Sequence, residues 1–246
     1  MSKTIGVIPA RFASTRFPGK PLFKIAGRPL LEWVIRGAKE AQTLSELIVA
    51  TDHEGIAKLC EQLGVKVMMT DSDLPSGSDR VWAAIKDLDC DAVVNIQGDE
   101  PLLKGELIDA LVKGFYASSN QAEMATLIKP IDPIEIKNPN VVKAVVNKNN
   151  EALYFSRLPI PYTRLNPEGK IEGCWQHLGL YVYKKSFLKE FCITPPCILE
   201  RCESLEQLRA LWLGAKIKTI RVDYQCMGVD TPEDVLKVEP LLKMMS

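Results

Sequence analysis

The sequence predicts an α/β fold: a mostly parallel, Rossmann-like sheet flanked by helices, with an antiparallel β insertion. Two observations predict it. In the first half of the chain, short apolar runs alternate with segments whose apolar residues recur at helical spacing, as in strand–helix units. Between 124 and 184, strand-like runs follow one another without long helices, and the alternation resumes after 204. We therefore expect a single domain over 1–246, with 124–184 as an insertion.

Four strands and four helices are expected to alternate in the first half. Buried strands are indicated by the apolar runs at 4–8, 46–51, 65–69 and 91–96. Helical spacing predicts helices over 29–41, 53–64, 78–88 and 105–118. Pro29 suits the first turn of its helix, a glycine closes the second, and His53 and Ser78 are candidate caps of the second and third.

The second half is expected to contain mainly strands. Strand-like runs occupy 124–131, 141–147, 151–157, 178–184 and 216–222, and helical spacing occupies 204–215 and 231–243. The stretch Asn147–Asn150 has the composition of a hairpin turn. Thr231 is a good cap for the closing helix, and Pro232 suits its first turn.

Composition excludes several classes of function. The chain has 246 residues, 46% of them hydrophobic, and its 31 Lys and Arg balance its 31 Asp and Glu. Zero net charge argues against bulk electrostatic binding of nucleic acid or of an anionic membrane. Seven cysteines without a CxxC pair indicate reduced thiols rather than a disulfide framework or a zinc site. With no apolar leader and no run near ~20 apolar residues, we expect a cytoplasmic protein without membrane insertion.

Cations gather in the loop after the first strand, in the stretch IPARFASTRFPGKPL. In open α/β sheets, ligands bind beyond the carboxyl ends of the strands. Arg11, Arg16 and Lys20 in a loop stiffened by two prolines therefore predict a polyphosphate site. The loop is not a P-loop, because Ser14 stands where that pattern needs glycine, and no GxGxxG follows the strand.

Several motifs together carry a family resemblance. They are PARFASTRFPGKPL, VATDHE, SGSDR, VNIQGDEPLL, ALYFSR, HLGLYVY, LEQLR and GVDTPED, in this order along nearly the whole chain. The chain resembles the 3-deoxy-manno-octulosonate cytidylyltransferases (CMP-Kdo synthetases) of lipopolysaccharide synthesis, in the sugar nucleotidyltransferase superfamily. The resemblance implies a nucleotide-diphospho-sugar transferase fold. It also implies transfer of CMP from CTP to the anomeric hydroxyl of 3-deoxy-manno-octulosonate (Kdo), with release of pyrophosphate.

Two carboxylates are candidate metal ligands. Asp99 follows the strand at 91–96, and Asp230 follows the predicted strand at 216–222 in the loop before the last helix, so both are expected at the ligand edge of the sheet. Mg²⁺ takes a few carboxylates together with phosphate oxygens, and the family places its metal ligands at these positions. A turn aspartate and a helix-capping aspartate are the alternative interpretations.

The resemblance also assigns the remaining site residues. Lys20 would act in catalysis beside Asp99 and Asp230. The nucleotide would contact Ala10, Arg11, Ser14, Arg16, Lys20, Ser76, Gly77, Arg80 and Gln97. The sugar would contact Arg157, His177, Tyr181, Glu206 and Gln207, with Arg157 and His177 at its carboxylate. The insertion would contribute to sugar binding and to a homodimer.

Two alternatives stay open from the sequence. The same chemistry could act on 8-amino-3,8-dideoxy-manno-octulosonate, because one side chain of the pocket could decide between the two sugars. A CTP-binding sensor without turnover would be expected to lose Asp99, Asp230 or the loop cations, and all are present.

Overall fold

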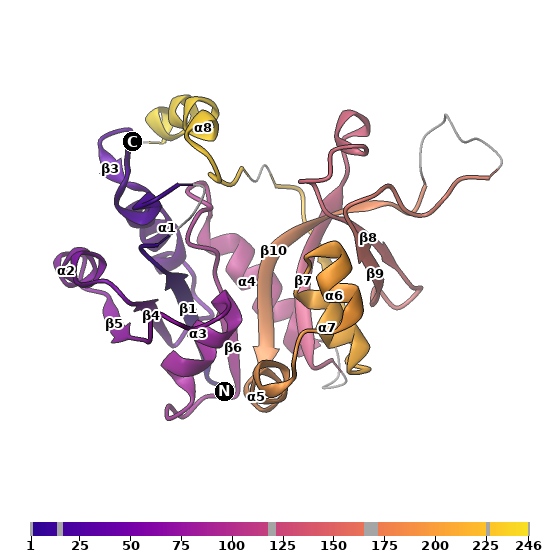
Figure 1. Ribbon diagram of the computed structural model, residues 1–246, viewed down its shortest axis with the longest axis horizontal. Coiled ribbons are helices and arrows are strands. Elements are labelled where there is room, and N and C mark those ends of the chain that lie inside the picture. The colour runs from indigo at the N-terminus through magenta and orange to yellow at the C-terminus, as the bar shows by residue number, and fades with distance from the viewer. Residues whose placement is uncertain (1, 14–16, 118–121, 165–171, 225–226, 246) are drawn as a thin grey trace. The chain divides into compact units, whose positions relative to one another are not determined.

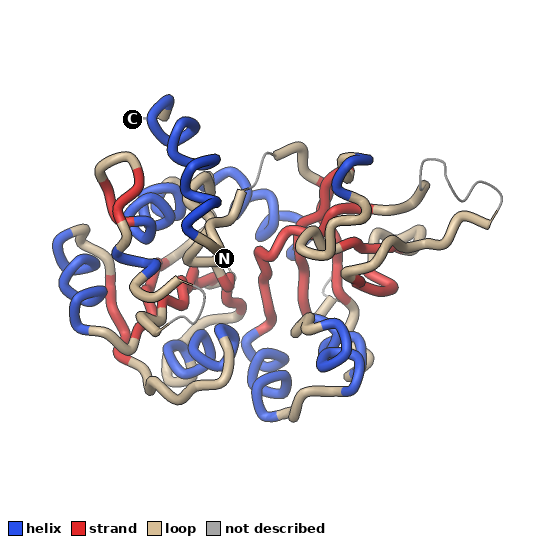
Figure 2. The backbone as a smooth tube through the Cα atoms, turned by 45° about the horizontal axis from the view of Figure 1, so that its top comes forward, coloured by secondary structure: helices blue, strands red, loops and turns tan. Residues whose placement is uncertain are grey.

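A computed structural model describes residues 2–13, 17–117, 122–164, 172–224 and 227–245. The chain divides into two compact units. Unit 1 comprises 1–112 and 225–246, and unit 2 comprises 113–224. Strands and helices occur in both units (Figures 1 and 2), and the expected insertion at 124–184 falls within unit 2.

The sheet of unit 1 is parallel. Its strands, in spatial order, are β6 (Ala92–Asn95), β1 (Thr4–Ala10), β4 (Glu46–Thr51) and β5 (Lys66–Met69). The two central strands and β6 are largely buried, which explains their nearly continuous apolar sequences. From β1 the chain moves outward to β4 and β5, then returns to β6 on the other side of β1. The order therefore reverses between β1 and β6, where open α/β sheets bind ligands.

Helices flank these strands (Figure 2). They are α1 (Leu30–Lys39), α2 (Glu54–Gln62), α3 (Gly77–Ile85), α4 (Gly105–Ala117), which continues into unit 2, and α8 (Pro232–Met244). His53 caps α2 as expected, because its Nδ1 accepts from the Gly55 N–H at 3.1 Å. The expectation that Ser78 caps α3 was wrong. The helix begins at Gly77, so Ser76 is the cap and accepts from the Asp79 N–H at 3.2 Å.

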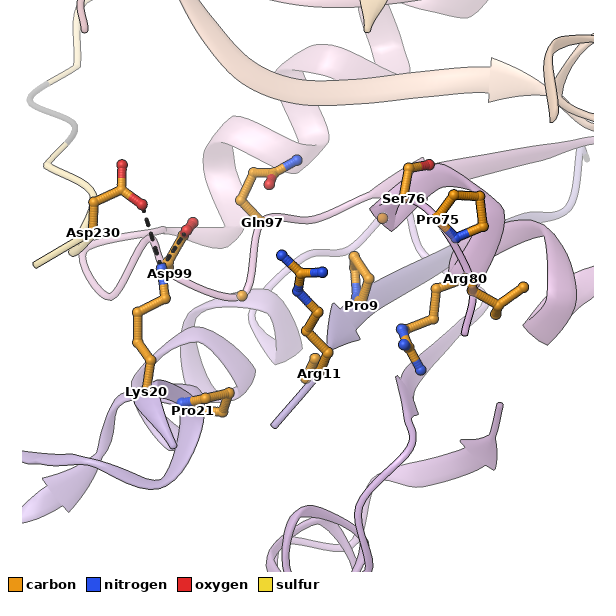
Figure 3. Close-up of a pocket in the computed structure, with 14 residues that line it drawn as sticks. Pro9, Arg11, Lys20, Pro21, Pro75, Ser76, Arg80, Gln97, Asp99 and Asp230 are labelled. Atoms are coloured by element: carbon orange, nitrogen blue, oxygen red, sulfur yellow. Dashed lines mark hydrogen bonds and ion pairs between the residues drawn. The ribbon is translucent and has the colours of Figure 1, made fainter. Parts of the chain in front are cut away.

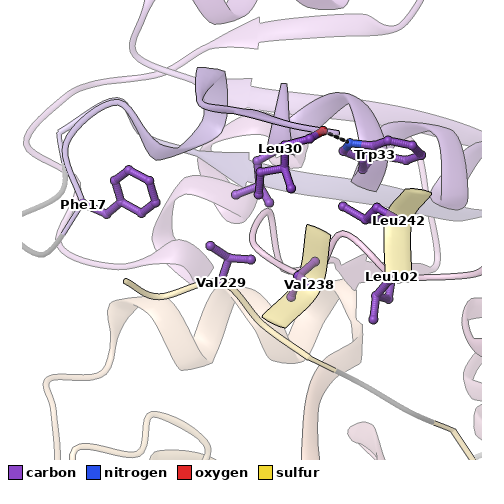
Figure 4. Packing of buried hydrophobic residues seen from close by; sticks show 8 residues of the cluster. Phe17, Leu30, Trp33, Leu102, Val229, Val238 and Leu242 are labelled. Carbon is purple, nitrogen blue, oxygen red and sulfur yellow. Dashed lines mark hydrogen bonds between the residues drawn. The ribbon is translucent and has the colours of Figure 1, made fainter. Parts of the chain in front are cut away.

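The last helix is fixed to unit 1 by an apolar cluster. Thr231 caps it as the sequence indicated, and together with Asp234 it forms a capping box. Figure 4 shows Val238 and Leu242 of α8 facing Leu30 and Trp33. The whole cluster comprises Phe17, Ile25, Leu30, Trp33, Leu102, Val229, Val238 and Leu242. Because it contains Val229, its packing determines where the neighbouring Asp230 lies.

Short elements lie between β1 and α1. They are the 3₁₀ turn η1 (Lys20–Leu22) and the two-stranded ribbon of β2 (Lys24–Ile25) and β3 (Arg28–Pro29). The Trp33 indole N–H donates to the Ile25 carbonyl at 2.9 Å and so ties this ribbon to α1.

Unit 2 contains the expected antiparallel strands. They are β7 (Met124–Pro130), β8 (Lys143–Val146), β9 (Ala152–Ser156) and β10 (Trp175–Lys184), joined by β11 (Ile217–Arg221). β10 is antiparallel to β7 and β8, β8 is antiparallel to β9, and β11 is parallel to β7. The predicted turn at 147–150 joins β8 to β9, with Asn150 in the left-handed region at φ 55°.

Two helices of unit 2 escape the sequence prediction. They are α5 (Lys185–Ile193) and α6 (Ile198–Glu203), which precede the expected α7 (Gln207–Trp212). The 3₁₀ turn η2 (Pro133–Glu135) is also additional. In α5, Phe187 and Phe191 pack together and Phe191 contacts Tyr183 of β10, so tertiary packing supports a helix only nine residues long. No helix in the described part of the chain is long and apolar enough to cross a bilayer.

Candidate active site

A pocket of about 270 Å³ lies in unit 1, at the carboxyl ends of β1 and β6 and the start of α3. It is at the switch point of the sheet, as the fold class predicts. Nine of the residues predicted for nucleotide or metal line it: Ala10, Arg11, Lys20, Ser76, Gly77, Arg80, Gln97, Asp99 and Asp230. Ser14 and Arg16, also predicted, lie outside the described residues.

Lys20 lies between the two predicted metal ligands (Figure 3). Its ammonium donates to Asp99 Oδ2 at 2.8 Å and to the Val229 carbonyl at 2.8 Å, and is 3.6 Å from Asp230 Oδ1. The side chains of Lys20 and Asp99 are 15% and 31% exposed, so this pair is partly shielded from solvent. Three segments far apart in sequence therefore bring one cation and two carboxylates to one point.

Backbone geometry brings these segments together. Gly19 adopts φ 70°, which favours glycine, and its N–H donates to the Phe12 carbonyl at 3.2 Å, closing the loop just before η1. The Val229 N–H donates to the Asp99 carbonyl at 2.9 Å. A Cβ at Gly98 would lie 3.1 Å from the Pro9 carbonyl oxygen, so glycine permits the close approach of the loop after β6 to the end of β1.

Two residues that were not predicted from the sequence hold the Arg80 side chain in place. Its guanidinium donates to Asp52 Oδ2 at 3.1 Å and to Thr70 Oγ1 at 2.5 Å. The other oxygen of Asp52 accepts from the Phe12 N–H at 3.2 Å. Asp52 therefore links the cationic loop to α3. Its position directly after β4, at the edge that carries Arg11, was a signal that could have identified it.

The carboxylate oxygens near Lys20 suit a hard cation that is also coordinated by a bound ligand. Asp99 and Asp230 offer carboxylate oxygens, and both lie within reach of one ammonium. The described residues contain no group of three His, Cys, Asp or Glu that could hold a metal by themselves. Mg²⁺ usually takes one or two carboxylates and completes its shell with phosphate oxygens and water, and Asp99 and Asp230 are donors of that kind.

Three of the predicted sugar-binding residues lie together in unit 2, and a fourth, Gln207, follows one of them directly in sequence. The rings of His177 and Tyr181 lie 5.4 Å apart between centroids, and the charge of Glu206 acts on Tyr181. Burial, and then that negative charge, raise the pKa of Tyr181, so its hydroxyl stays protonated. Gln207 is 4% exposed, and its Nε2 has no hydrogen-bond partner among the described residues. A buried amide donor without a partner calls for a specific explanation, such as a bound water or ligand.

The fifth predicted residue, Arg157, follows β9 and is held by backbone groups. Its guanidinium donates to the carbonyls of Glu203 at 2.7 Å, Pro139 at 3.0 Å and Ser204 at 3.1 Å. Buried Lys143 donates to the Arg157 carbonyl at 2.6 Å, and Glu203 Oε2 accepts from the Arg157 N–H at 2.9 Å. Three of the five guanidinium N–H bonds are thereby used, and two remain for a ligand. The sequence reasoning missed Lys143 and Glu203.

The fold and the pocket are those of an α/β protein that binds a phosphorylated ligand beyond its parallel strands. A family model described as cytidylyltransferase matches residues 5–217. The 3-deoxy-manno-octulosonate cytidylyltransferase of Bdellovibrio bacteriovorus is 60% identical over 242 residues, which cover 98% of each chain. The chain belongs to the cytidylyltransferase family.

Other relatives agree with this assignment. The mitochondrial 3-deoxy-manno-octulosonate cytidylyltransferase of Arabidopsis thaliana is 42% identical over 247 residues, covering 98% of this chain and 84% of that protein. A solved structure of CMP:2-keto-3-deoxy-manno-octonic acid synthetase complexed with CTP matches with a TM-score of 0.93 and 36% identity, over 100% of both chains. These matches span the whole chain and confirm the resemblance identified from its motifs.

Proposed function

We propose that this protein transfers CMP from CTP to the anomeric hydroxyl of Kdo, releasing pyrophosphate, as a step toward lipopolysaccharide. The observation that carries the proposal is the convergence of Lys20, Asp99 and Asp230 in a pocket also lined by Arg11 and Arg80. The relatives named for this reaction, matched over nearly the whole chain, support it.

In the proposed reaction, the anomeric oxygen attacks the α-phosphorus of CTP and loses its proton. The bond from that phosphorus to the bridging oxygen breaks, and pyrophosphate leaves with the electron pair. Both substrates are anions, so positioning and neutralisation of charge dominate catalysis. Arg11 and Lys20 supply positive charge to the phosphates, and Gln97 offers both a donor and an acceptor to the cytosine.

Asp99 and Asp230 would hold Mg²⁺. The bound ion would neutralise phosphate charge and fix the orientation of the triphosphate. Lys20 holds the two carboxylates near each other, because a cation between them relieves their mutual repulsion.

A turnover assay tests the function. Pyrophosphate release is measured with CTP, ATP, GTP and UTP, each with Kdo or its 8-amino analogue, with and without Mg²⁺. We expect release with CTP, Kdo and Mg²⁺ together. Faster turnover of the 8-amino sugar would identify that sugar as the acceptor of the same CMP transfer. CTP binding in calorimetry without turnover of either sugar would favour a sensor instead.

Gln207 provides a prediction specific to the acid sugar. Gln207→Met keeps the volume and removes the buried donor that lacks a partner. We expect the KM for Kdo to rise about tenfold, the factor that one hydrogen bond is worth, while the KM for CTP stays unchanged. The free energy of unfolding should not fall, because no hydrogen bond to that donor is lost. The control is Gln62→Met on the exposed surface of α2. An unchanged KM for Kdo would remove Gln207 from the proposed sugar site.

We also propose a homodimer in the cytoplasm. Leu153 and Leu158, on and just after β9, are 58% and 69% exposed, and β9 is the terminal strand of the unit 2 sheet. Exposed apolar side chains on an outer strand favour association with a second copy. The seven cysteines, irregularly spaced and without a CxxC pair, are typical of a protein from a reducing compartment. A monomer in sedimentation velocity at micromolar concentration would contradict the dimer.

A further inference from the structure

The ring of His177 is held by a buried threonine on the neighbouring strand. Thr126 of β7 is fully buried, and its Oγ1 lies 3.0 Å from His177 Nε2. The same oxygen lies 3.0 Å from the Leu178 carbonyl and 2.9 Å from the Leu180 carbonyl. A β-bulge explains this arrangement, because the pairing of β10 with β7 shifts between Leu178 and Tyr181.

Counting donors and acceptors determines the direction of each bond. A hydroxyl has one hydrogen, and carbonyl oxygens only accept. The Thr126 hydroxyl therefore donates to one of the two carbonyls, and its oxygen accepts from His177 Nε2–H. If the hydroxyl donated to Nε2 instead, Thr126 Oγ1 would face both carbonyl oxygens without a proton between them, which is repulsive. The neutral ring then carries its proton on Nε2 and leaves Nδ1 as an acceptor.

The surroundings keep the ring neutral and oriented. Burial lowers the pKa of His177 to about 3, so the ring is uncharged at neutral pH. Phe155 packs against it edge-on, at 4.9 Å between ring centroids, and the Tyr181 ring lies 5.4 Å away, tilted by 38°. Among the described residues, Thr126 is the one side chain that forms a hydrogen bond with the ring.

We propose that Thr126 is a positioning residue that fixes the Nε2–H tautomer of His177, so that Nδ1 accepts a hydrogen bond from a hydroxyl of the acid sugar. This rests on the proposed function for the identity of the sugar. It changes the role expected from the family resemblance, in which His177 and Arg157 share the carboxylate. A bare Nδ1 repels a carboxylate and attracts a hydroxyl, so the carboxylate is left to Arg157 and other donors.

The tautomer can be read directly in the free protein. The chain has two histidines, and His53→Asn, which retains a helix-capping side chain, leaves the His177 ring as a single spin system. In a long-range ¹H–¹⁵N spectrum of uniformly ¹⁵N-labelled protein, we expect Nε2 protonated and Nδ1 unprotonated. The opposite assignment in the otherwise wild-type protein would overturn the proposal. This measurement needs no substrate, so it is independent of whether Kdo is the acceptor.

Three variants connect the tautomer to the substrate. Thr126→Val removes the hydroxyl at nearly constant shape, and Thr126→Ser keeps it. Thr219→Val is the matched control, because Thr219 pairs with Thr126 in register on β11, is buried, and donates to the Asn150 carbonyl rather than to His177. We expect Thr126→Val alone to produce a mixture of tautomers and to raise the KM for Kdo about tenfold, with the KM for CTP unchanged. Thr126→Ser should restore both.

Two further outcomes would overturn the proposal. One is an unchanged tautomer in Thr126→Val, which would show that the threonine does not set it. The other is a changed tautomer with an unchanged KM for Kdo, which would show that Nδ1 does not contact the sugar. Equal losses of affinity in Thr126→Val and Thr219→Val would indicate a general effect on the sheet and would also count against it.

Discussion

Replacing Asp99 by asparagine is expected to lower turnover by about 10³-fold or more, while the protein stays folded. The substitution removes one of the two carboxylates that converge on Lys20 and replaces it with a neutral amide, a weaker ligand for a hard cation. The Lys20 ammonium retains its bond to the Val229 carbonyl, so the loops should remain in place. Steady-state pyrophosphate release with CTP and Kdo, over a titration of Mg²⁺, gives the result.

The control for this prediction is Asp87→Asn. Asp87 is exposed just after α3 and does not line the pocket, so the same loss of charge there should leave turnover unchanged. Circular dichroism and the thermal midpoint of both variants check the fold. An Asp99→Asn protein that keeps more than a tenth of wild-type turnover at saturating Mg²⁺ would refute the metal-binding role of Asp99.

Replacing Asp52 by alanine is expected to lower the free energy of unfolding by about 3 kcal/mol. The side chains of Arg80 and Asp52 are only 3% and 10% exposed, so the substitution leaves a buried guanidinium without its counter-ion. It also removes the acceptor of the Phe12 N–H in the cationic loop. CTP affinity, measured by calorimetry without Kdo, should fall as well. Asp52 holds Arg80 directly and holds the backbone next to Arg11, and both arginines line the pocket.

An exposed ion pair provides the comparison. Glu46 lies on the same strand, β4, and pairs with Lys66 at 2.9 Å, with side chains 34% and 42% exposed. Glu46→Ala should cost less than about 1 kcal/mol, because solvent screens exposed pairs. Urea unfolding of both variants measures the two effects. Equal losses of unfolding free energy in Asp52→Ala and Glu46→Ala would show that burial does not increase the contribution of the Asp52–Arg80 pair to stability.

The regular elements of unit 1 could be predicted because their patterns are local. The run Glu46–Thr51 is a strand with the predicted bounds, and α4 begins at the predicted residue, Gly105. Continuous apolar runs and helical spacing are visible within ten residues of sequence. Short helices such as α5 and α6 are harder to predict, because packing against distant strands stabilises them more than their own sequences do.

The chemistry of the candidate site was also accessible from the sequence. A strand followed by cations and an aspartate after a second parallel strand are enough to predict that Lys20 and Asp99 meet, because parallel strands end at one edge of the sheet. Asp230 was assigned together with the family motifs, and the packing of its neighbour Val229 places it. The structure brings these three side chains together. The family motifs added the identities of the nucleotide and the sugar, which no spacing rule supplies.

Only the tertiary structure decided which residues support that chemistry. Asp52 and Thr70 beside Arg80, Lys143 and Glu203 around Arg157, and Thr126 against His177 all act through hydrogen bonds between different segments of the chain, from 10 to 51 residues apart. Their side chains have no pattern that distinguishes them from ordinary polar residues of strands and loops. A hydrogen bond depends on distances of a few tenths of an ångström and on direction, and these are fixed only when both partners are packed in place.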